Sequence, residues 1–214
     1  MVFLAHHGYR VIAHNRRGHG RSTQTWEGNN SNSDQFSDDL NELFAHLNVK
    51  DAMMVGHSHG GGEVTRYLGR HGTKRVKKAV LIGAVPPFML KAAANPEGTD
   101  KSVFHSFRQG MHEDRSQFFL DIPTGPFFNF NKPGVKKSEG QIQNWWRQGM
   151  TEDLKKIDIP VLVRDQVVPF KASGQKSSKL LPQGKLKVYP GGSHAIHCTN
   201  IDEVNKDLLN FLQS

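Results

Sequence analysis

The sequence is poor in cysteine and lacks any long apolar run. Its 214 residues include a single cysteine, Cys198, so no intramolecular disulfide can form and a reducing compartment is expected. No stretch approaches the roughly 18 unbroken apolar residues of a membrane helix, and residues 1–7 lack the basic start and apolar run of a secretory signal. These absences predict a cytoplasmic protein with no membrane partner.

Positive charge is in excess, at a formal +8 at pH 7, but lysine and arginine are scattered along the chain. Aromatic residues do not interleave with them at the spacing of a base-stacking surface. We therefore expect solvated helix faces and no nucleic-acid partner. A length of 214 residues with 36% hydrophobic residues predicts one globular domain over residues 1–214.

Short apolar runs alternate with longer amphipathic ones, a pattern typical of a parallel sheet with crossover helices. Strands are expected over residues 10–14, 51–55, 78–85, 160–163 and 185–189. Helices are expected over residues 34–47, 62–71 and 204–212. The fold class predicted is α/β, with a mostly parallel sheet and flanking helices.

Residues 86–150 break this alternation with many phenylalanines and tryptophans, punctuated by proline and glycine. We interpret them as a helical cap (lid) inserted between two strands. Most of the aromatic side chains are expected to pack the cap against the sheet, because a cap needs a core of its own. A lid over an apolar pocket is the alternative for the others.

The run Gly56-His57-Ser58-His59-Gly60 fits the pattern G-x-S-x-G, between a predicted strand and a predicted helix. An abrupt turn from strand to helix strains the central residue, and only small neighbours avoid a clash. The Ser58 hydroxyl is then exposed at the end of the strand, and the helix N-terminus offers N–H groups to a developing oxyanion. A phosphate-binding loop is the rival interpretation, but no Gly-Lys-Ser/Thr ending follows.

A serine nucleophile needs a base and an acid that orients the base. In this kind of fold they follow the serine in the order Asp or Glu, then His. Asp165 ends one predicted strand and His194 follows the last, so both are expected at the edge that carries Ser58. His197 is the weaker candidate for the base. His57 and His59 are interpreted as occupants of the variable positions of the motif.

Taken together, these residues resemble the non-haem chloroperoxidase and aryl esterase (perhydrolase) branch of the α/β-hydrolases. The resemblance rests on blocks at residues 8–14, 16–22, 56–64, 70–76, 85–87, 125–128, 165–169 and 187–191. In the family pattern the acid precedes Gln-Val-Val-Pro and stands 29 positions before the histidine, as Asp165 and His194 do here. The spacing favours Asp165 over Asp158 or Asp202.

The resemblance implies hydrolysis of small acyl or aryl esters through an acyl-enzyme, with Ser58, Asp165 and His194 as the triad. Hydrogen peroxide can replace water, so the partners implied are an ester, or a short carboxylic acid plus peroxide, with no haem, metal or flavin cofactor. A homo-oligomer is compatible with it. The backbone N–H of His59 would be an oxyanion donor. The implied substrate pocket is lined by Val85, Met89, Phe127, Phe128, Val167 and Val168.

The chain departs from the family in several blocks. Three strands that precede the opening segment in the family are absent, together with a His-Gly-Trp-type loop that supplies the second oxyanion N–H. We expect an N-terminally truncated fold with a hole in the sheet between residues 10–14 and 53–55, and a rate lower by about 10²–10³-fold. A helix after Met150 and a His-Gly-Asp after Val163 are also missing, and Asn15 replaces an aspartate.

Two other functions remain as hypotheses. The pair His57 and His59, with His6-His7, His14 and His19, prompts a metal-dependent hydrolase, although zinc needs three or four converging ligands. The missing blocks prompt a catalytically impaired or inactive fragment, or a binding protein built on a hydrolase scaffold.

Overall fold

The computed structural model describes residues 1–24, 33–124, 150–165 and 170–214. In chain order the elements are α1 (Val2–His6), α2 (Ser33–His46), β1 (Ala52–His57), α3 (His59–His71), β2 (Val76–Ile82), α4 (Lys101–Glu113), α5 (Arg115–Thr124), α6 (Thr151–Lys155), β3 (Val161–Asp165), α7 (Gly174–Leu180), β4 (Gly184–Val188), α8 (Ile196–Thr199) and α9 (Ile201–Gln213). None of the helices in these ranges combines the length and the apolar composition needed to span a bilayer.

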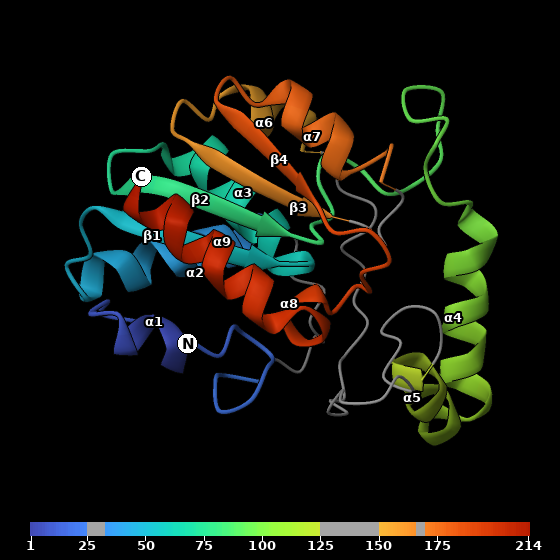
Figure 1. Cartoon of the computed structure of the whole chain (residues 1–214). Helices are drawn as coiled ribbons and strands as arrows, with labels where there is room; N and C mark the ends of the chain where they lie inside the picture. The colour runs from blue at the N-terminus through green and yellow to red at the C-terminus, as the bar shows by residue number, and fades with distance from the viewer. Residues whose placement is uncertain (25–32, 125–149, 166–169) are drawn as a thin grey trace.

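The four strands form one parallel sheet in the order β1-β2-β3-β4 (Figure 1). Their carboxyl ends therefore meet at one edge, where Ser58 follows β1 and Asp165 ends β3. The four strands predicted after residue 50 and the three predicted helices are confirmed, with ends shifted by a few residues. The parallel α/β sheet is confirmed with them.

The strand predicted over residues 10–14 is wrong, because this segment is irregular and pairs with no strand in the described ranges. Its side chains are mostly exposed, with Ile12 at 44%. Beside β1, where the sequence predicts a missing strand, no strand pairs within the described ranges: β1 is an edge strand, and Val55 is 43% exposed. Backbone groups at an open edge can bind water, so the penalty of about 1–3 kcal/mol for each buried unpaired group does not arise.

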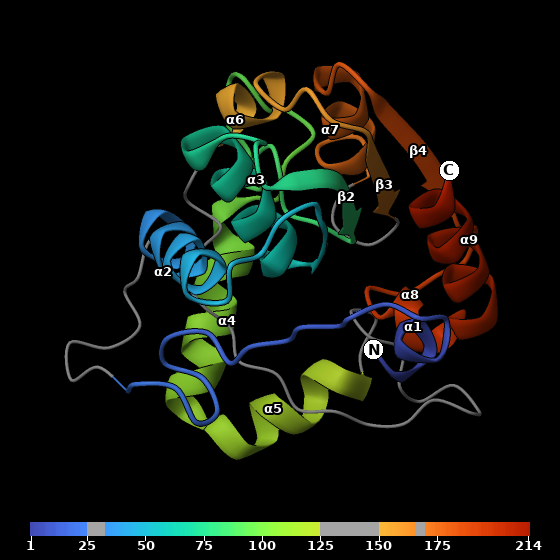
Figure 2. The same ribbon diagram turned by 90° about the vertical axis from the view of Figure 1, so that its left-hand side faces the viewer.

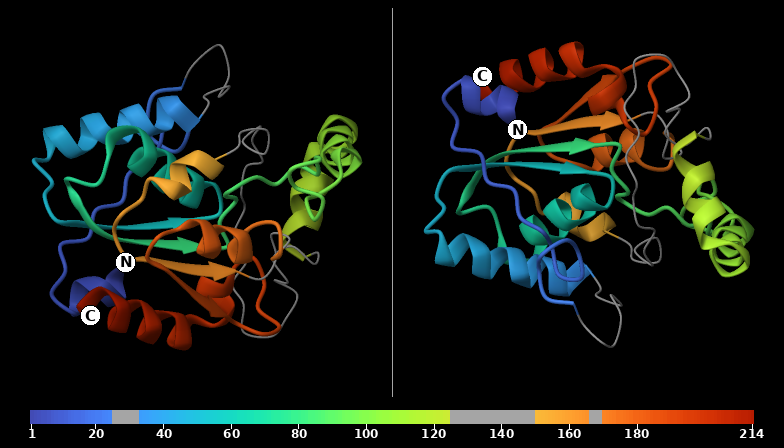
Figure 3. Two further views of the ribbon diagram at one scale, coloured as in Figure 1. Left: turned by 90° about the horizontal axis from the view of Figure 1, so that it is seen from above. Right: turned by 90° about the horizontal axis from the view of Figure 1, so that it is seen from below.

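Helices cover both faces of the sheet (Figures 2 and 3). One face packs against α2, α3, α6 and the end of α7, and the other against α1, α8 and α9. The buried second half of β2 shows the alternation of a strand, because Ala79 and Leu81 face the first layer and Val80 and Ile82 face the second. Burial on both faces explains why residues 79–82 form a continuous apolar run.

The helices α4 and α5 stand away from the sheet, beyond the carboxyl ends of the strands (Figure 1). Asp100 caps α4 by accepting a hydrogen bond from the backbone N–H of Ser102 at 2.9 Å. Both helices lie in the segment interpreted as a cap. The bounds of that cap, residues 86–150, stay a prediction because residues 125–149 lie outside the described ranges.

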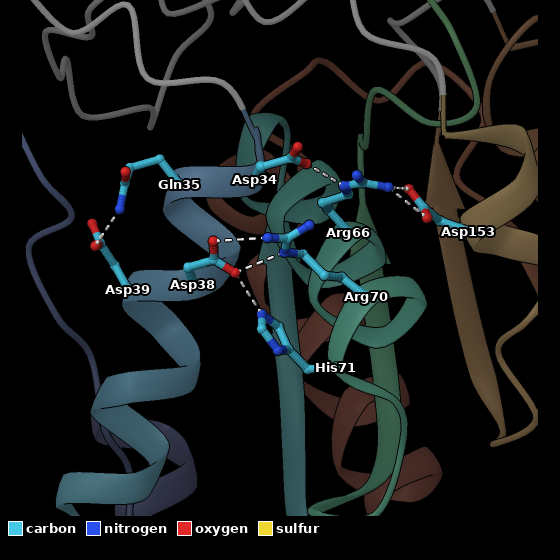
Figure 4. Close-up of polar contacts among 8 residues, drawn as sticks. All are labelled: Asp34, Gln35, Asp38, Asp39, Arg66, Arg70, His71 and Asp153. Atoms are coloured by element: carbon cyan, nitrogen blue, oxygen red, sulfur yellow. Dashed lines mark hydrogen bonds and ion pairs between the residues drawn. The ribbon is translucent and has the colours of Figure 1, made fainter.

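Ion pairs connect α3 to α2 and to α6 (Figure 4). Arg66 of α3 donates to Asp34 of α2 and, from Nη1, to both oxygens of Asp153 of α6 at 2.9 and 3.1 Å. One turn later Arg70 contacts Asp38 at 2.7 Å. The Asp153 side chain is 5% exposed, whereas those of Arg70 and Asp38 are about 40% exposed. The Arg66 contacts should therefore contribute more to stability than the Arg70 contact.

Replacing Arg66 by Met is expected to lower the free energy of unfolding by about 2 kcal/mol, because it leaves the buried Asp153 carboxylate without its cation. The measurement is equilibrium unfolding in urea at neutral pH. Arg70→Met is the matched control on the same helix face, and its unfolding midpoint should stay near that of the parent chain. Equal losses in the two variants would contradict the assignment.

Candidate active site

Ser58 lies at a strained turn between β1 and α3. Its φ is +54° and its ψ −119°, a conformation that side chains rarely adopt. The turn brings the strand so close to the helix that a Cβ added to Gly56 would lie 2.3 Å from the carbonyl oxygen of Gly60. Glycine at position 56 is therefore required by close backbone approach, as the motif predicts.

The imidazole of His194 meets the Ser58 hydroxyl. Nε2 of His194 lies 2.8 Å from Oγ of Ser58, across 136 positions of sequence. His194 follows β4 in the loop before α8 and is 3% exposed. Burial, with the neighbouring His57 and His197, lowers the pKa of His194 to about 3, so the ring is neutral at neutral pH. A neutral Nε2 at this distance can accept the hydroxyl proton.

Gly83, directly after β2, makes room for this ring. Its φ is +50°, and a Cβ added there would lie 3.2 Å from Nδ1 of His194. A larger residue would be strained in its backbone and crowded against the base. Gly83 was not among the predicted site residues, although a glycine that interrupts an apolar strand run is a signal of close approach.

Asp165 is the last residue of β3, and its backbone pairs in register with Val188 at the end of β4. Asp165 therefore lies at the sheet edge where Ser58 and His194 meet. Its side chain lies outside the part of the chain that the structure describes, so its role as the triad acid stays a prediction. Asp158 precedes β3, at the opposite end of that strand, where Oδ1 accepts a hydrogen bond from Thr73 at 2.7 Å.

His59 is the first residue of α3, so its backbone N–H points out of the helix N-terminus beside Ser58. Its buried side chain is fixed by Arg16, whose Nη1 lies 2.7 Å from Nδ1 of His59. Because a guanidinium only donates, Nδ1 must be the unprotonated nitrogen. Burial and the charge of Arg16 lower the pKa of His59 to about 3, so this side chain is neutral at neutral pH.

Glu63 completes this cluster one turn further along α3. Its carboxylate, 5% exposed, lies 3.3 Å from Nε of Arg16 and 3.6 Å from Nε2 of His14. The cluster therefore connects the irregular segment at residues 14–16 to the start of α3. Arg16 also compensates the negative charge of the buried Glu63 carboxylate. The sequence does not predict this cluster, because no local pattern connects residues 43 or more positions apart.

The predicted pocket residues are only partly described. Val85 and Met89 are buried and pack against Phe104 of α4 in a small apolar cluster between the sheet and the cap helices. Phe127, Phe128, Val167 and Val168 lie outside the described residues. The substrate pocket stays a prediction.

The histidines of the motif diverge. The ring of His57 lies 4.8 Å from that of His194 and 4.4 Å from that of His197, whereas His59 contacts Arg16. Within the ranges that the structure describes, no group of three or more His, Cys, Asp or Glu side chains is arranged to hold a metal ion. The side chains of His57 and His59 therefore do not converge as the two ligands of one metal ion, which the metal hypothesis requires.

Known proteins resemble the chain over its full length. Residues 1–201 match the family described as the alpha/beta hydrolase fold. A non-haem haloperoxidase from Rhodococcus erythropolis is 48% identical over 100% of this chain and 86% of its own length. A bifunctional esterase/perhydrolase from Acinetobacter calcoaceticus is 47% identical, over 100% of this chain and 85% of its own.

The structural comparison agrees with these matches. A bromoperoxidase from Bacillus anthracis superimposes with a TM-score of 0.90 at 33% identity, covering 100% of this chain and 85% of its own. The alignment with the Rhodococcus protein spans 237 positions against the 214 residues of this chain, which leaves 23 positions with no residue here. The chain belongs to the α/β-hydrolase family of enzymes, in the branch of the non-haem haloperoxidases and esterase/perhydrolases.

Proposed function

We propose that the chain is a serine hydrolase of small acyl or aryl esters that works through an acyl-enzyme. The observation that carries the proposal is the 2.8 Å contact between Oγ of Ser58 and Nε2 of His194, made at a strained turn in front of a helix N-terminus. This contact supplies the activated nucleophile that acyl transfer needs. The esterase/perhydrolase relative supports the same chemistry.

In the first half-reaction Nε2 of His194 takes the proton of the Ser58 hydroxyl as Oγ attacks the ester carbonyl carbon. The oxyanion that forms is stabilised by the N–H of His59 and by the positive end of α3. The intermediate then collapses, the C–O bond to the alcohol breaks, and His194 returns the proton to the departing oxygen. The products are the free alcohol and an ester of Ser58. Asp165 is the proposed partner of His194.

In the second half-reaction a water molecule gives its proton to His194 and attacks the acyl-enzyme, releasing a carboxylic acid and Ser58. We propose that hydrogen peroxide enters the same step, in which case the product is a peracid. A peracid then oxidises a halide ion to hypohalous acid in solution and is itself reduced to the carboxylic acid. No haem, metal or flavin takes part in this scheme.

A catalytically impaired chain is the second candidate, favoured by a separate observation. The alignment with the Rhodococcus relative leaves 23 positions unfilled in this chain. If these positions include a second oxyanion donor, the rate is expected to fall by about 10²–10³-fold. The nucleophile and base would still react, only slowly.

The test is a panel of nitrophenyl esters from acetate to octanoate, assayed with and without hydrogen peroxide and bromide. We expect hydrolysis that favours short acyl chains, bromide oxidation that requires both peroxide and an acyl donor, and rates that EDTA leaves unchanged. Loss of activity with EDTA would favour the metal-dependent hydrolase. Folded protein with no ester hydrolysis at all would reject the proposed function.

A further inference from the structure

His57 contacts the loop that carries the base. It ends β1, directly before Ser58, and its Nε2 lies 2.8 Å from the backbone carbonyl oxygen of His194. The two residues are 137 positions apart in the sequence, and their rings lie 4.8 Å apart. His57 therefore connects the strand that precedes the nucleophile to the loop that carries the base.

The direction of this hydrogen bond fixes the state of His57. A carbonyl oxygen only accepts, so Nε2 of His57 must carry the hydrogen. Burial lowers the pKa of His57, which keeps the ring neutral at neutral pH, and a neutral imidazole has one N–H to give. That N–H already donates to the backbone carbonyl of His194. His57 therefore serves as a donor, and the proton of Ser58 goes to His194.

Two further hydrogen bonds of the loop are local. The N–H of Gly192 donates to the carbonyl of Tyr189 at 3.0 Å, and the N–H of Ala195 donates to Oγ of Ser193 at 3.1 Å. These bonds shape the loop but do not tie it to β1. The His57 bond does, because it joins the carbonyl of His194 to the residue next to the nucleophile.

We propose that His57 is a positioning residue, which holds the His194 loop so that the imidazole stays within reach of Ser58. This inference rests on the proposed function. A displacement of reacting groups by about 1 Å can cost about 100-fold in rate, so one well-placed donor on this loop has a large effect on turnover. Because His57 contacts the backbone of the His194 loop, its replacement should change substrate affinity little.

The test compares His57→Phe, which keeps an aromatic ring but has no donor, with His57→Gln, whose amide can donate to the same carbonyl. We expect His57→Phe to lower kcat for a nitrophenyl ester by about 10- to 100-fold with KM within about twofold. His57→Gln should recover most of kcat. His46→Phe is the matched control, since His46 is exposed at the end of α2, and its kcat should stay near that of the parent chain.

The rate of Ser58 labelling by a fluorophosphonate separates this inference from the proposed function. Slow labelling of His57→Phe beside fast labelling of the parent chain and of His57→Gln supports a positioning role. Equal labelling of the parent chain and His57→Phe, or equal losses of kcat in His57→Phe and His57→Gln, would overturn it while leaving the proposed function intact. A folded parent chain that is not labelled at Ser58 would overturn both. If His57→Phe does not fold, His57→Met, which also lacks a donor, takes its place in the same comparison with His57→Gln.

Discussion

Replacement of Ser58 by Ala is expected to lower kcat/KM for a short nitrophenyl ester by at least about 10³-fold, the largest effect on activity predicted for any single residue. The alanine variant keeps the turn and the buried His194 but has no oxygen to acylate. Removal of the base, as His194→Gln, should cost a similar factor, because Oγ then keeps its proton. Initial rates over a range of ester concentrations give both values.

Nucleophile and base act as one unit, so the double variant should be hardly worse than either single variant. Ser193→Ala is a matched control for the loop, because Ser193 lies next to His194 but its hydroxyl contacts Ala195 and Thr199. Its rate should remain within about tenfold of the parent rate. If Ser58→Ala retains more than a tenth of the parent activity while folded, another group is the nucleophile.

Stability is expected to fall steeply between pH 7 and pH 5. Two buried histidines, His59 and His194, have a pKa lowered from 6.5 to about 3. Below pH 6.5 the unfolded chain takes up protons at these rings and the native protein does not, so unfolding is favoured as pH falls, until the native rings titrate near pH 3. At pH 5 the His59 ring costs about 2 kcal/mol out of a typical total of 5–15 kcal/mol, and His194 adds to this loss in the same direction.

Urea unfolding at pH 7, 6 and 5 measures this loss. His197, with a pKa lowered to about 4 by burial and by His57, adds to the loss in the same direction. His59→Gln should flatten the pH dependence by roughly one proton. Equal stability at pH 7 and pH 5 would show that these rings are not held neutral in the native protein.

The sheet and the turn at Ser58 could be predicted from the sequence because their signals are local. The apolar run of β2 and the glycines around Ser58 each fall within a few residues, and backbone sterics translate them directly into structure. Residues 10–14 carry an equally apolar pattern, yet they form no strand, because a strand also needs a neighbour to bond. A local sequence pattern does not show which strand, if any, a segment will pair with.

The site could be predicted in part. Ser58 and His194 were identified from a motif and from chain order, and the structure brings them together. The donor bond of His57 and the cluster of Arg16, His59 and Glu63 could not be predicted, since each joins side chains from segments far apart in the chain. Only the folded chain shows which of the twelve histidines face one another.

Labelling with a fluorophosphonate, followed by mass spectrometry of the peptides, shows directly whether His194 activates Ser58 as a nucleophile. This reagent phosphonylates a serine only where a neighbouring base has activated it. The account predicts one adduct, on Ser58, formed by the folded parent chain and absent from His194→Gln. Folded protein that carries no adduct on Ser58, or that labels equally well without His194, would contradict it.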